Sequence, residues 1–256
     1  SYFNPSVNAS LVLSEALDIK SSVLDFLKIR GGWSEVGSDA DPYQLATVYD
    51  IETNFGGNPI LTSSKIKNNP DLKPETTRST EFGAELGLFG NRVHLDVAVY
   101  NTNSINQIQP VKTSASSEYT TQILNAGKIN NKGLEIQLDL VPVDLKSFKW
   151  NIGLNYAINK SEVKILDDAG KLTSFEIASS GTTQVLASVG QAYGTLYGSA
   201  YLRDGDGNIV VDSKGLPVKD SQNKILGHYT PKWTGGLSNT FTYKNIELSA
   251  LIDASI

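Results

Sequence analysis

Apolar and polar residues alternate with a period of two over eight long stretches of the chain. In "EFGAELGL", residues 81–88, the even positions are apolar and the odd positions are glycine or glutamate. A period of two places successive side chains on opposite faces of a β-strand. We therefore predict an all-β protein with strands at residues 2–13, 26–36, 76–89, 92–105, 131–142, 148–160, 232–243 and 246–256.

The predicted strands are about ten to fourteen residues long, whereas strands of soluble domains cluster near five or six. That length suits a tilted strand that crosses a bilayer. On the strand at 92–105 the alternation predicts a lipid-facing set, Val93, Leu95, Val97 and Val99, and a lumen-facing set, Arg92, His94 and Asp96. On the preceding strand Glu81 and Glu85 are expected to face the lumen, because a carboxylate on the lipid face is unfavourable.

The connections between strands are of two kinds. Residues 88–93, 141–148 and 242–247 read as tight turns, whereas 37–75, 106–130 and 161–231 are long and polar. Short turns at one end and long loops at the other are typical of outer-membrane barrels, with the long loops outside the cell. The strand-like pieces "TTQVLASV" and "GTLYGSAYL" within 161–231 are then expected to be loop hairpins or an extra strand pair, not barrel strands.

Aromatic residues gather near both ends of the predicted strands, as two interfacial belts would require. The lower group is Phe26, Phe89, Phe148, Trp150, Phe241 and Tyr243, and the upper group is Trp33, Tyr100, Tyr156 and Trp233.

Composition narrows the function classes. The 256 residues carry a net charge of −5 without any run of Lys or Arg, so a nucleic-acid partner, which needs a concentrated basic face, is not expected. The chain contains no cysteine and no methionine, and its first residues do not form a signal peptide. We interpret it as a mature or truncated chain.

Candidate chemistry is sparse. "DGDGNIVVD", residues 204–212, resembles a calcium loop, but Ile209 and Gly215 stand where an EF-hand needs glycine and a bidentate acid, so a hairpin turn is favoured. His94, expected in the lumen, and His228, expected in a loop, lack metal-ligand spacing. No nucleophile elbow, phosphate loop or zinc motif occurs. We therefore predict no enzymatic activity, no metal and no cofactor.

The stretch "NPDLKPETTRSTEFGAEL" resembles the element of TonB-dependent outer-membrane receptors in which Leu-Lys-Pro-Glu leads from an extracellular loop into a barrel strand with an inward Glu. More narrowly, the chain resembles the SusC/RagA type of nutrient importer. The matching pieces, in the family's order, include "LKIRGGWSEVG", "LNAGKINNKGLEIQLDLVPV", "FKWNIGLNYAINKSEVKIL" and "HYTPKWTGGLSNTFTYKNIELSALID".

The resemblance implies a function that belongs to a larger protein. Such receptors have a plug and a barrel of roughly 22 strands, so residues 1–256 would be a partial up-and-down transmembrane β-barrel domain of about eight strands, with long extracellular loops and with the plug absent. It further implies active import of a glycan or peptide across the outer membrane, surrounded by outer-membrane lipid. TonB would act through the absent plug, and a SusD-like lipoprotein would close over the barrel.

Six tyrosines of the proposed outer loops are candidate ligand contacts, since their rings can stack on sugar or peptide: Tyr43, Tyr49, Tyr119, Tyr193, Tyr197 and Tyr201. Loop packing or contact with a partner explains each of them equally well. Two other architectures stay open: a soluble β-sandwich that binds glycans or serves adhesion, with the apolar faces forming a dry core, and a self-contained eight-stranded barrel.

Overall fold

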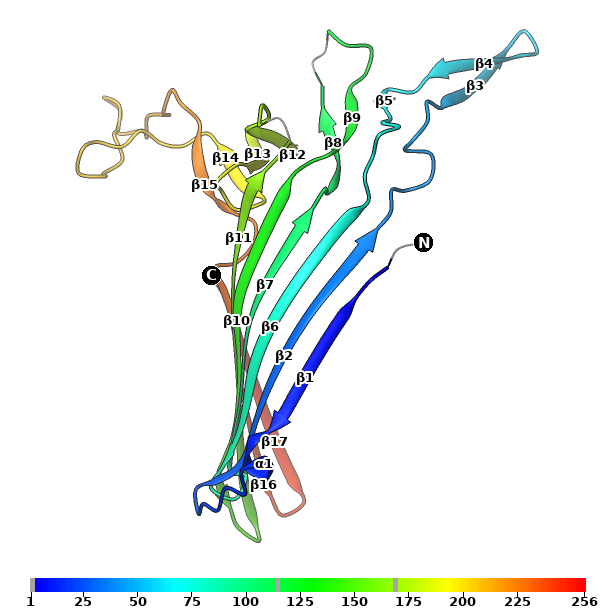
Figure 1. The fold of residues 1–256 in the computed structure, drawn as a ribbon. Coiled ribbons are helices and arrows are strands. Elements are labelled where there is room, and N and C mark those ends of the chain that lie inside the picture. The colour runs from blue at the N-terminus through cyan, green and yellow to red at the C-terminus, as the bar shows by residue number, and fades with distance from the viewer. Residues whose placement is uncertain (1–2, 114–115, 168–169) are drawn as a thin grey trace.

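The computed structural model describes residues 3–113, 116–167 and 170–256, and its main feature is a single antiparallel sheet of eight long strands (Figure 1). Every strand pairs with its neighbours in the chain, as an up-and-down meander requires. The strands are β1 (Ser6–Val12), β2 (Leu24–Ser38), β6 (Glu75–Leu88), β7 (Val93–Ile105), β10 (Lys128–Asp144), β11 (Phe148–Ile165), β16 (Trp233–Tyr243) and β17 (Ile246–Ser255).

All eight predicted strands are therefore confirmed, and their order confirms the all-β, up-and-down arrangement. Residue 2, the first of the predicted strand at 2–13, lies outside the described residues, as do short parts of the links 106–130 and 161–231. β1 begins four residues later than predicted. The largest difference is at the loop end, where β10 begins three residues before the prediction and β11 ends five residues after it. Their extra residues pair with one another above the apolar positions, where alternation gives no signal.

The register aligns the apolar positions of neighbouring strands on one face of the sheet. Phe82 lies opposite Val99, which lies opposite Leu134. On the other face Glu85 lies opposite Asp96, which lies opposite Gln137. We call these two surfaces the apolar face and the polar face. The predicted sorting is confirmed for Val93, Leu95, Val97, Val99, His94 and Asp96, whereas Arg92 lies in the turn before β7, where register does not place its side chain.

The apolar face has the height of a membrane. On β11 it runs from Phe148 to Ile158, and ten residues at about 3.3 Å each, tilted by about 40°, span roughly 25 Å. Large side chains on it stay open, among them Phe82 at 62% exposed and Ile252 at 65%. No second sheet covers this face in the described part of the chain. A soluble sandwich would bury the face in a dry core, so the sandwich interpretation fails.

Connections at one end of the sheet are short, as predicted (Figure 1). β1 joins β2 through α1 (Leu13–Ala16), and β6 joins β7 through a turn in which Phe89, Gly90 and Asn91 all have positive φ. No helix in the described residues is long and apolar enough to cross a membrane.

Connections at the other end are long and contain small sheets of their own (Figure 1). One is the hairpin of β3 (Tyr49–Phe55) and β4 (Asn58–Ser63), and another combines β5 (Ile66–Lys67), β9 (Thr121–Asn125) and β8 (Ile108–Lys112). The third has four strands: β12 (Ser174–Ser180), β13 (Thr183–Ser188), β14 (Thr195–Gly198) and β15 (Lys224–His228). The pieces "TTQVLASV" and "GTLYGSAYL" contribute β13 and β14 to this loop sheet. This confirms that they are not strands of the eight-stranded sheet, which we call the wall.

The main cluster of buried apolar residues lies above the wall, at the loop end, and not within it. It joins the tops of β10 and β11 to the loop strands β8, β12 and β13, through Val111, Ala126, Ile129, Val163, Leu166, Phe175 and Ala187. Val163 and Ala187 are fully buried. Loops outside the membrane meet water and need a core of their own. This cluster holds the sheet of β5, β9 and β8 and the four-stranded loop sheet over the eight-stranded sheet.

Two aromatics assigned to the interfacial belts lie on the wrong face for that role. Tyr100 is opposite Glu81 and Gly133, and Phe26 is opposite Gly87, all on the polar face. Phe26 shares its parity with Lys28 and Arg30, which places it on the polar face although it lies near the short turns. The apolar face does carry the Trp150–Phe241 stack, with ring centroids 5.6 Å apart, near the short turns, and the Tyr156–Trp233 pair toward the loops.

Candidate functional site

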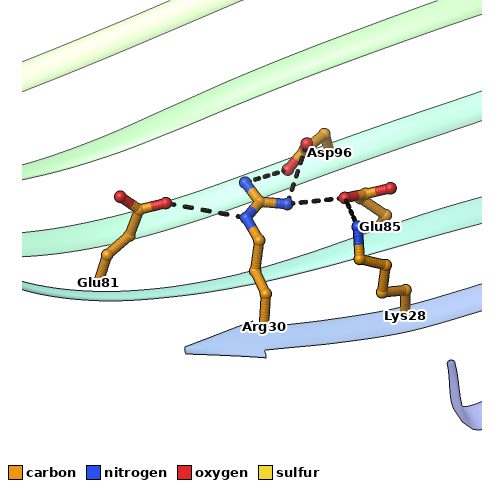
Figure 2. A network of polar contacts seen from close by, with 5 residues as sticks. All are labelled: Lys28, Arg30, Glu81, Glu85 and Asp96. Carbon is orange, nitrogen blue, oxygen red and sulfur yellow. Dashed lines mark hydrogen bonds and ion pairs between the residues drawn. The ribbon is translucent and has the colours of Figure 1, made fainter. Parts of the chain in front are cut away.

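A cluster of five charged side chains lies on the polar face across three adjacent strands (Figure 2). Arg30 of β2 is at its centre. Its guanidinium lies 2.8 Å from a carboxylate oxygen of Asp96 on β7, 3.2 Å from Glu85 and 3.7 Å from Glu81, both on β6. Lys28 of β2 adds a second cation, 2.9 Å from Glu85. Three carboxylates and two cations leave the cluster with one net negative charge.

The strand register explains why these side chains meet. Lys28 is opposite Glu85, and Glu85 is opposite Asp96, so that these three residues form one row across the wall. Arg30 is opposite Gly83. A Cβ at Gly83 would lie 2.6 Å from the Cζ atom of Arg30. Glycine therefore lets the guanidinium lie flat over β6 and reach β7.

Two polar hollows adjoin the cluster. One of about 350 Å³ is lined by Lys28, Arg30 and Glu81 together with residues of β1. The other, of about 230 Å³, is lined by Arg30, Asp96 and further residues that include Glu135, Gln137 and Asn155. Guanidinium, carboxylate and amide groups can bind water, a sugar hydroxyl or a peptide group. The arrangement suits a hydrated lumen wall.

The sequence predicted only part of this cluster. Glu81, Glu85 and Asp96 were expected on one face, toward the lumen, and they do share the polar face of the sheet. Lys28 and Arg30 were missed, although both alternate with the apolar Leu27 and Ile29 and could have been assigned to the same face. The contact from β2 across β6 to β7 needs the register and the glycine, which the sequence alone does not give.

The six tyrosines lie in separate parts of the loop end, and the structure does not bring them together. Tyr43 and Tyr49 lie in the β2–β6 connection and are 81% and 63% exposed. Tyr119 lies between β8 and β9, where its carbonyl accepts a hydrogen bond from the Thr113 hydroxyl. The other three, Tyr193, Tyr197 and Tyr201, belong to the β11–β16 connection.

Within that last group the roles differ. Tyr193 packs against the buried cluster at the loop end, and its burial raises the pKa of its hydroxyl. Tyr197 lies in the four-stranded loop sheet. Tyr201, 55% exposed, forms an isolated bridge with Lys219 at the base of a projecting arm, residues 199–223. Tyr193 thus has a packing role in addition to any ligand role.

The suspected calcium segment is a tight turn. The carboxylate of Asp204 accepts backbone hydrogen bonds from Asp206 at 3.0 Å and Asn208 at 2.8 Å. These bonds hold the pKa of Asp204 below its usual range. Among the described residues no group of three or more potential ligands could hold a metal ion. His228 lies in the loop strand β15, where its ring contacts the Thr195 hydroxyl at 3.2 Å.

The hairpin of β3 and β4 exposes an apolar surface to solvent. Ile51 lies directly opposite Leu61, and Tyr49 lies on the same face two residues before Ile51. Ile51 is 78% exposed and Leu61 is 62% exposed. The opposite face carries Asp50 and Thr62. A lone two-stranded hairpin is marginally stable in water, so this apolar face is suited to contact with another molecule.

The chain that forms the eight-stranded sheet matches a known protein family. The family model described as "TonB dependent receptor-like, beta-barrel" matches residues 1–251. TonB-dependent receptor P3 of Formosa agariphila is 25% identical over 265 residues, covering 92% of this chain and 26% of the relative. TonB-dependent receptor SusC of Bacteroides thetaiotaomicron is 26% identical over 257 residues, covering 92% of this chain and 25% of the relative.

Solved structures show the same fold. The RagAB peptide importer in its "closed-closed" state superposes with a TM-score of 0.81 at 22% identity, over 98% of this chain and 29% of that chain. A structure of the RagAB peptide transporter gives 0.80 at 22% identity, over 97% and 28%. The chain thus spans about a quarter of the length of the curated relatives it matches.

Proposed function

Because the chain belongs to the TonB-dependent receptor β-barrel family, we propose that its parent protein imports an oligomeric nutrient, a glycan or a peptide, in concert with a SusD-like surface lipoprotein. The family consists of outer-membrane receptors and transporters, so the chain is part of a barrel in the outer membrane and its expected work is transport, not catalysis. TonB would supply energy through a plug region outside this chain.

The observation that carries the proposal is the eight-stranded wall with two different faces. Its apolar face is about as tall as a bilayer core, and its polar face presents the Arg30 cluster and two polar hollows. A wall of this kind separates lipid from a hydrated passage. The self-contained eight-stranded barrel receives no support, because β1 and β17 are the two ends of an open sheet and do not pair with each other.

The names of the relatives support the substrate class. SusC is one relative, and RagAB is described as a peptide transporter. The polar hollows can bind sugar hydroxyls and peptide groups alike. We therefore propose a glycan or peptide oligomer as the cargo.

The partner surface is proposed on the β3–β4 hairpin. A lipoprotein that closes over the barrel would bury the apolar face of Tyr49, Ile51 and Leu61, and this burial would stabilise the hairpin. A second candidate is the arm at residues 199–223, in which Asp204 and Asp212 each cap a tight turn. Bridges from Tyr201 to Lys219 and from Val211 to Pro217 hold the two sides of this arm together.

The test uses the full-length receptor expressed with the lipoprotein. Ile51→Thr combined with Leu61→Thr should reduce co-purification of the lipoprotein and uptake of labelled oligomer. Asp50→Asn combined with Thr62→Ser alters the opposite face of the same hairpin and should leave both unchanged. Equal levels of each receptor at the cell surface are the control for insertion.

Deletion of residues 204–222 tests the arm separately. It cuts no strand of the wall, so insertion should be retained while lipoprotein association or uptake falls. If neither the hairpin variant nor the arm deletion changes co-purification or uptake, these loops do not engage a partner, and the proposed assembly is wrong.

A further inference from the structure

Two lysines lie opposite each other immediately above the apolar face. Leu134 of β10 and Ile158 of β11 are paired and form part of its uppermost row. Lys132 and Lys160, two residues further along each strand toward the loops, are also paired and therefore lie on the same outward face. The step of two residues raises them by about 5 Å along the membrane normal. That position corresponds to the headgroup level of the outer leaflet.

This pairing places like charges side by side. Directly opposed residues on antiparallel strands have Cβ atoms about 5 Å apart, and like charges at that separation repel. Both lysines are exposed, and within the described residues no carboxylate lies close enough to form an ion pair with either. The nearest acid along β11, Glu162, is already paired with Lys164 at 2.6 Å. Glu162 also acts on Lys132 and Lys160 over a longer distance, so that the three lysines around it carry two more charges than it can balance.

A third lysine reaches the same region. Lys160 and Lys232 both line a hollow of about 650 Å³ at the top of β11, with Ile158 among its other lining residues. Lys232 is exposed and has no ion-pair partner in the described part of the chain. Next to it in the chain, Trp233 lies opposite Ile158 on the uppermost apolar row. Glu162 lines the hollow too, so two ammonium groups, one carboxylate and an apolar residue of the lipid-facing surface meet there.

From this juxtaposition we propose that Lys132, Lys160 and Lys232 form a binding site for the phosphate of a glycolipid in the outer leaflet. The acyl chains would lie on Leu134, Ile158 and Trp233, and the phosphate would neutralise the opposed ammonium groups above them. The site is continuous with the lipid-exposed surface, and a lipid headgroup supplies anionic charge at that depth. The proposal rests on the position of the chain in the outer membrane and does not depend on nutrient import.

The experiment measures lipid retention by the purified, delipidated full-length receptor in detergent, without lipoprotein or nutrient. The probes are lipid A and the same lipid after removal of its phosphate groups, and bound lipid is counted by native mass spectrometry. The test variant carries Lys132→Gln, Lys160→Gln and Lys232→Gln. The control variant carries Lys171→Gln, Lys214→Gln and Lys219→Gln, which remove the same charge from the outer loops.

The wild-type receptor should retain the phosphorylated lipid in preference to the dephosphorylated one. An ammonium group near an anionic headgroup contributes about fivefold in affinity, so the triple substitution should weaken retention by roughly a hundredfold. The control variant should behave like wild type. Equal retention of the two lipids by wild type, or unchanged retention by the test variant, would overturn the site. In a separate co-purification with the lipoprotein, loss of lipoprotein binding by a test variant whose lipid retention is unchanged would assign the lysines to a protein contact instead.

Discussion

Replacing Arg30 by methionine should weaken the wall more than the same replacement of Lys28. Arg30 is bound to Asp96 and Glu85 and lies close to Glu81, whereas Lys28 pairs with Glu85 alone among the described residues. Without Arg30, Asp96 loses the hydrogen bond and the second ion-pair contact that tie it to the cluster. Without Lys28, Glu85 still keeps Arg30. Methionine retains most of the length of either side chain, so packing changes little.

The size of the effect follows from how far the charges are buried. The side chains of Arg30, Glu85 and Asp96 are 27%, 20% and 30% exposed. Breaking a fully buried ion pair costs about 3–5 kcal/mol, and breaking an exposed pair costs about 0–1 kcal/mol. A cluster between these limits should lose about 2 kcal/mol for Arg30→Met. The loss for Lys28→Met should stay near 1 kcal/mol or below, because its partner remains paired.

A double-mutant cycle isolates the ion pair. The free energy of unfolding of the full-length receptor in lipid vesicles is measured in urea for Arg30→Met, Asp96→Asn and the double variant. We expect a coupling of about 1–2 kcal/mol. A matched cycle of Lys28→Met with Asp96→Asn, which are linked only through Glu85 and Arg30, should give a clearly smaller coupling. Similar couplings in the two cycles would refute the geometry of the cluster.

Three further predictions follow from the two faces, the open edges and the loops. Leu138→Lys, near the middle of the apolar face, should destabilise the folded receptor in vesicles by about 2–4 kcal/mol, while Gln137→Lys on the polar face should shift the urea midpoint little; equal shifts would contradict the sorting of faces. Residues 1–256 alone should need detergent, because β1 and β17 have unpaired edges; a monodisperse monomer in plain buffer would contradict this. The bond from Lys112 lowers the pKa of Glu176 from 4.5 to about 2. The stabilisation of the loops by this ion pair is therefore present above about pH 4.5 and lost as the pH falls toward 2. Limited proteolysis of the loops should show this loss in wild type but not in Glu176→Gln, and identical pH profiles would contradict it.

The wall was predictable because membrane-spanning strands obey a simple pattern. One face must be apolar over the full bilayer thickness, so Val93, Leu95, Val97 and Val99 stand out without any alignment. The turns at 88–93 and 242–247 were readable from their composition in the same way. Strand order then followed, because short turns join antiparallel neighbours.

Contacts across strands were not predictable to the same degree. Tyr100 is aromatic and lies toward the end of the apolar positions, so its assignment to a belt was reasonable, yet its parity matches that of Asp96 and it lies on the polar face. There its ring covers Gly133, at which a Cβ would lie 2.2 Å from Cζ of the tyrosine. The Arg30 cluster likewise depends on Gly83. Predicting such contacts requires knowing which residues lie opposite each other on neighbouring strands.

The loop end was the least predictable part. Its strands are short, and several pair across long stretches of sequence, such as Ile66 with Thr121 in parallel. The ion pair of Lys112 with Glu176 joins two different connections. Neither the alternation of apolar residues nor the composition of turns indicates contacts between residues so far apart in the sequence. Loop sheets and their core therefore had to come from the structure.

The central claim is that one face of this sheet meets lipid while the other faces the lumen. The chain has no cysteine, so single cysteines at positions 93–97 and 99 of β7 can each carry a nitroxide label in a full-length receptor kept free of other accessible cysteines. In bilayers, collision of the label with oxygen should be high at residues 93, 95, 97 and 99 and low at residues 94 and 96. Equal oxygen accessibility at odd and even positions would contradict the account.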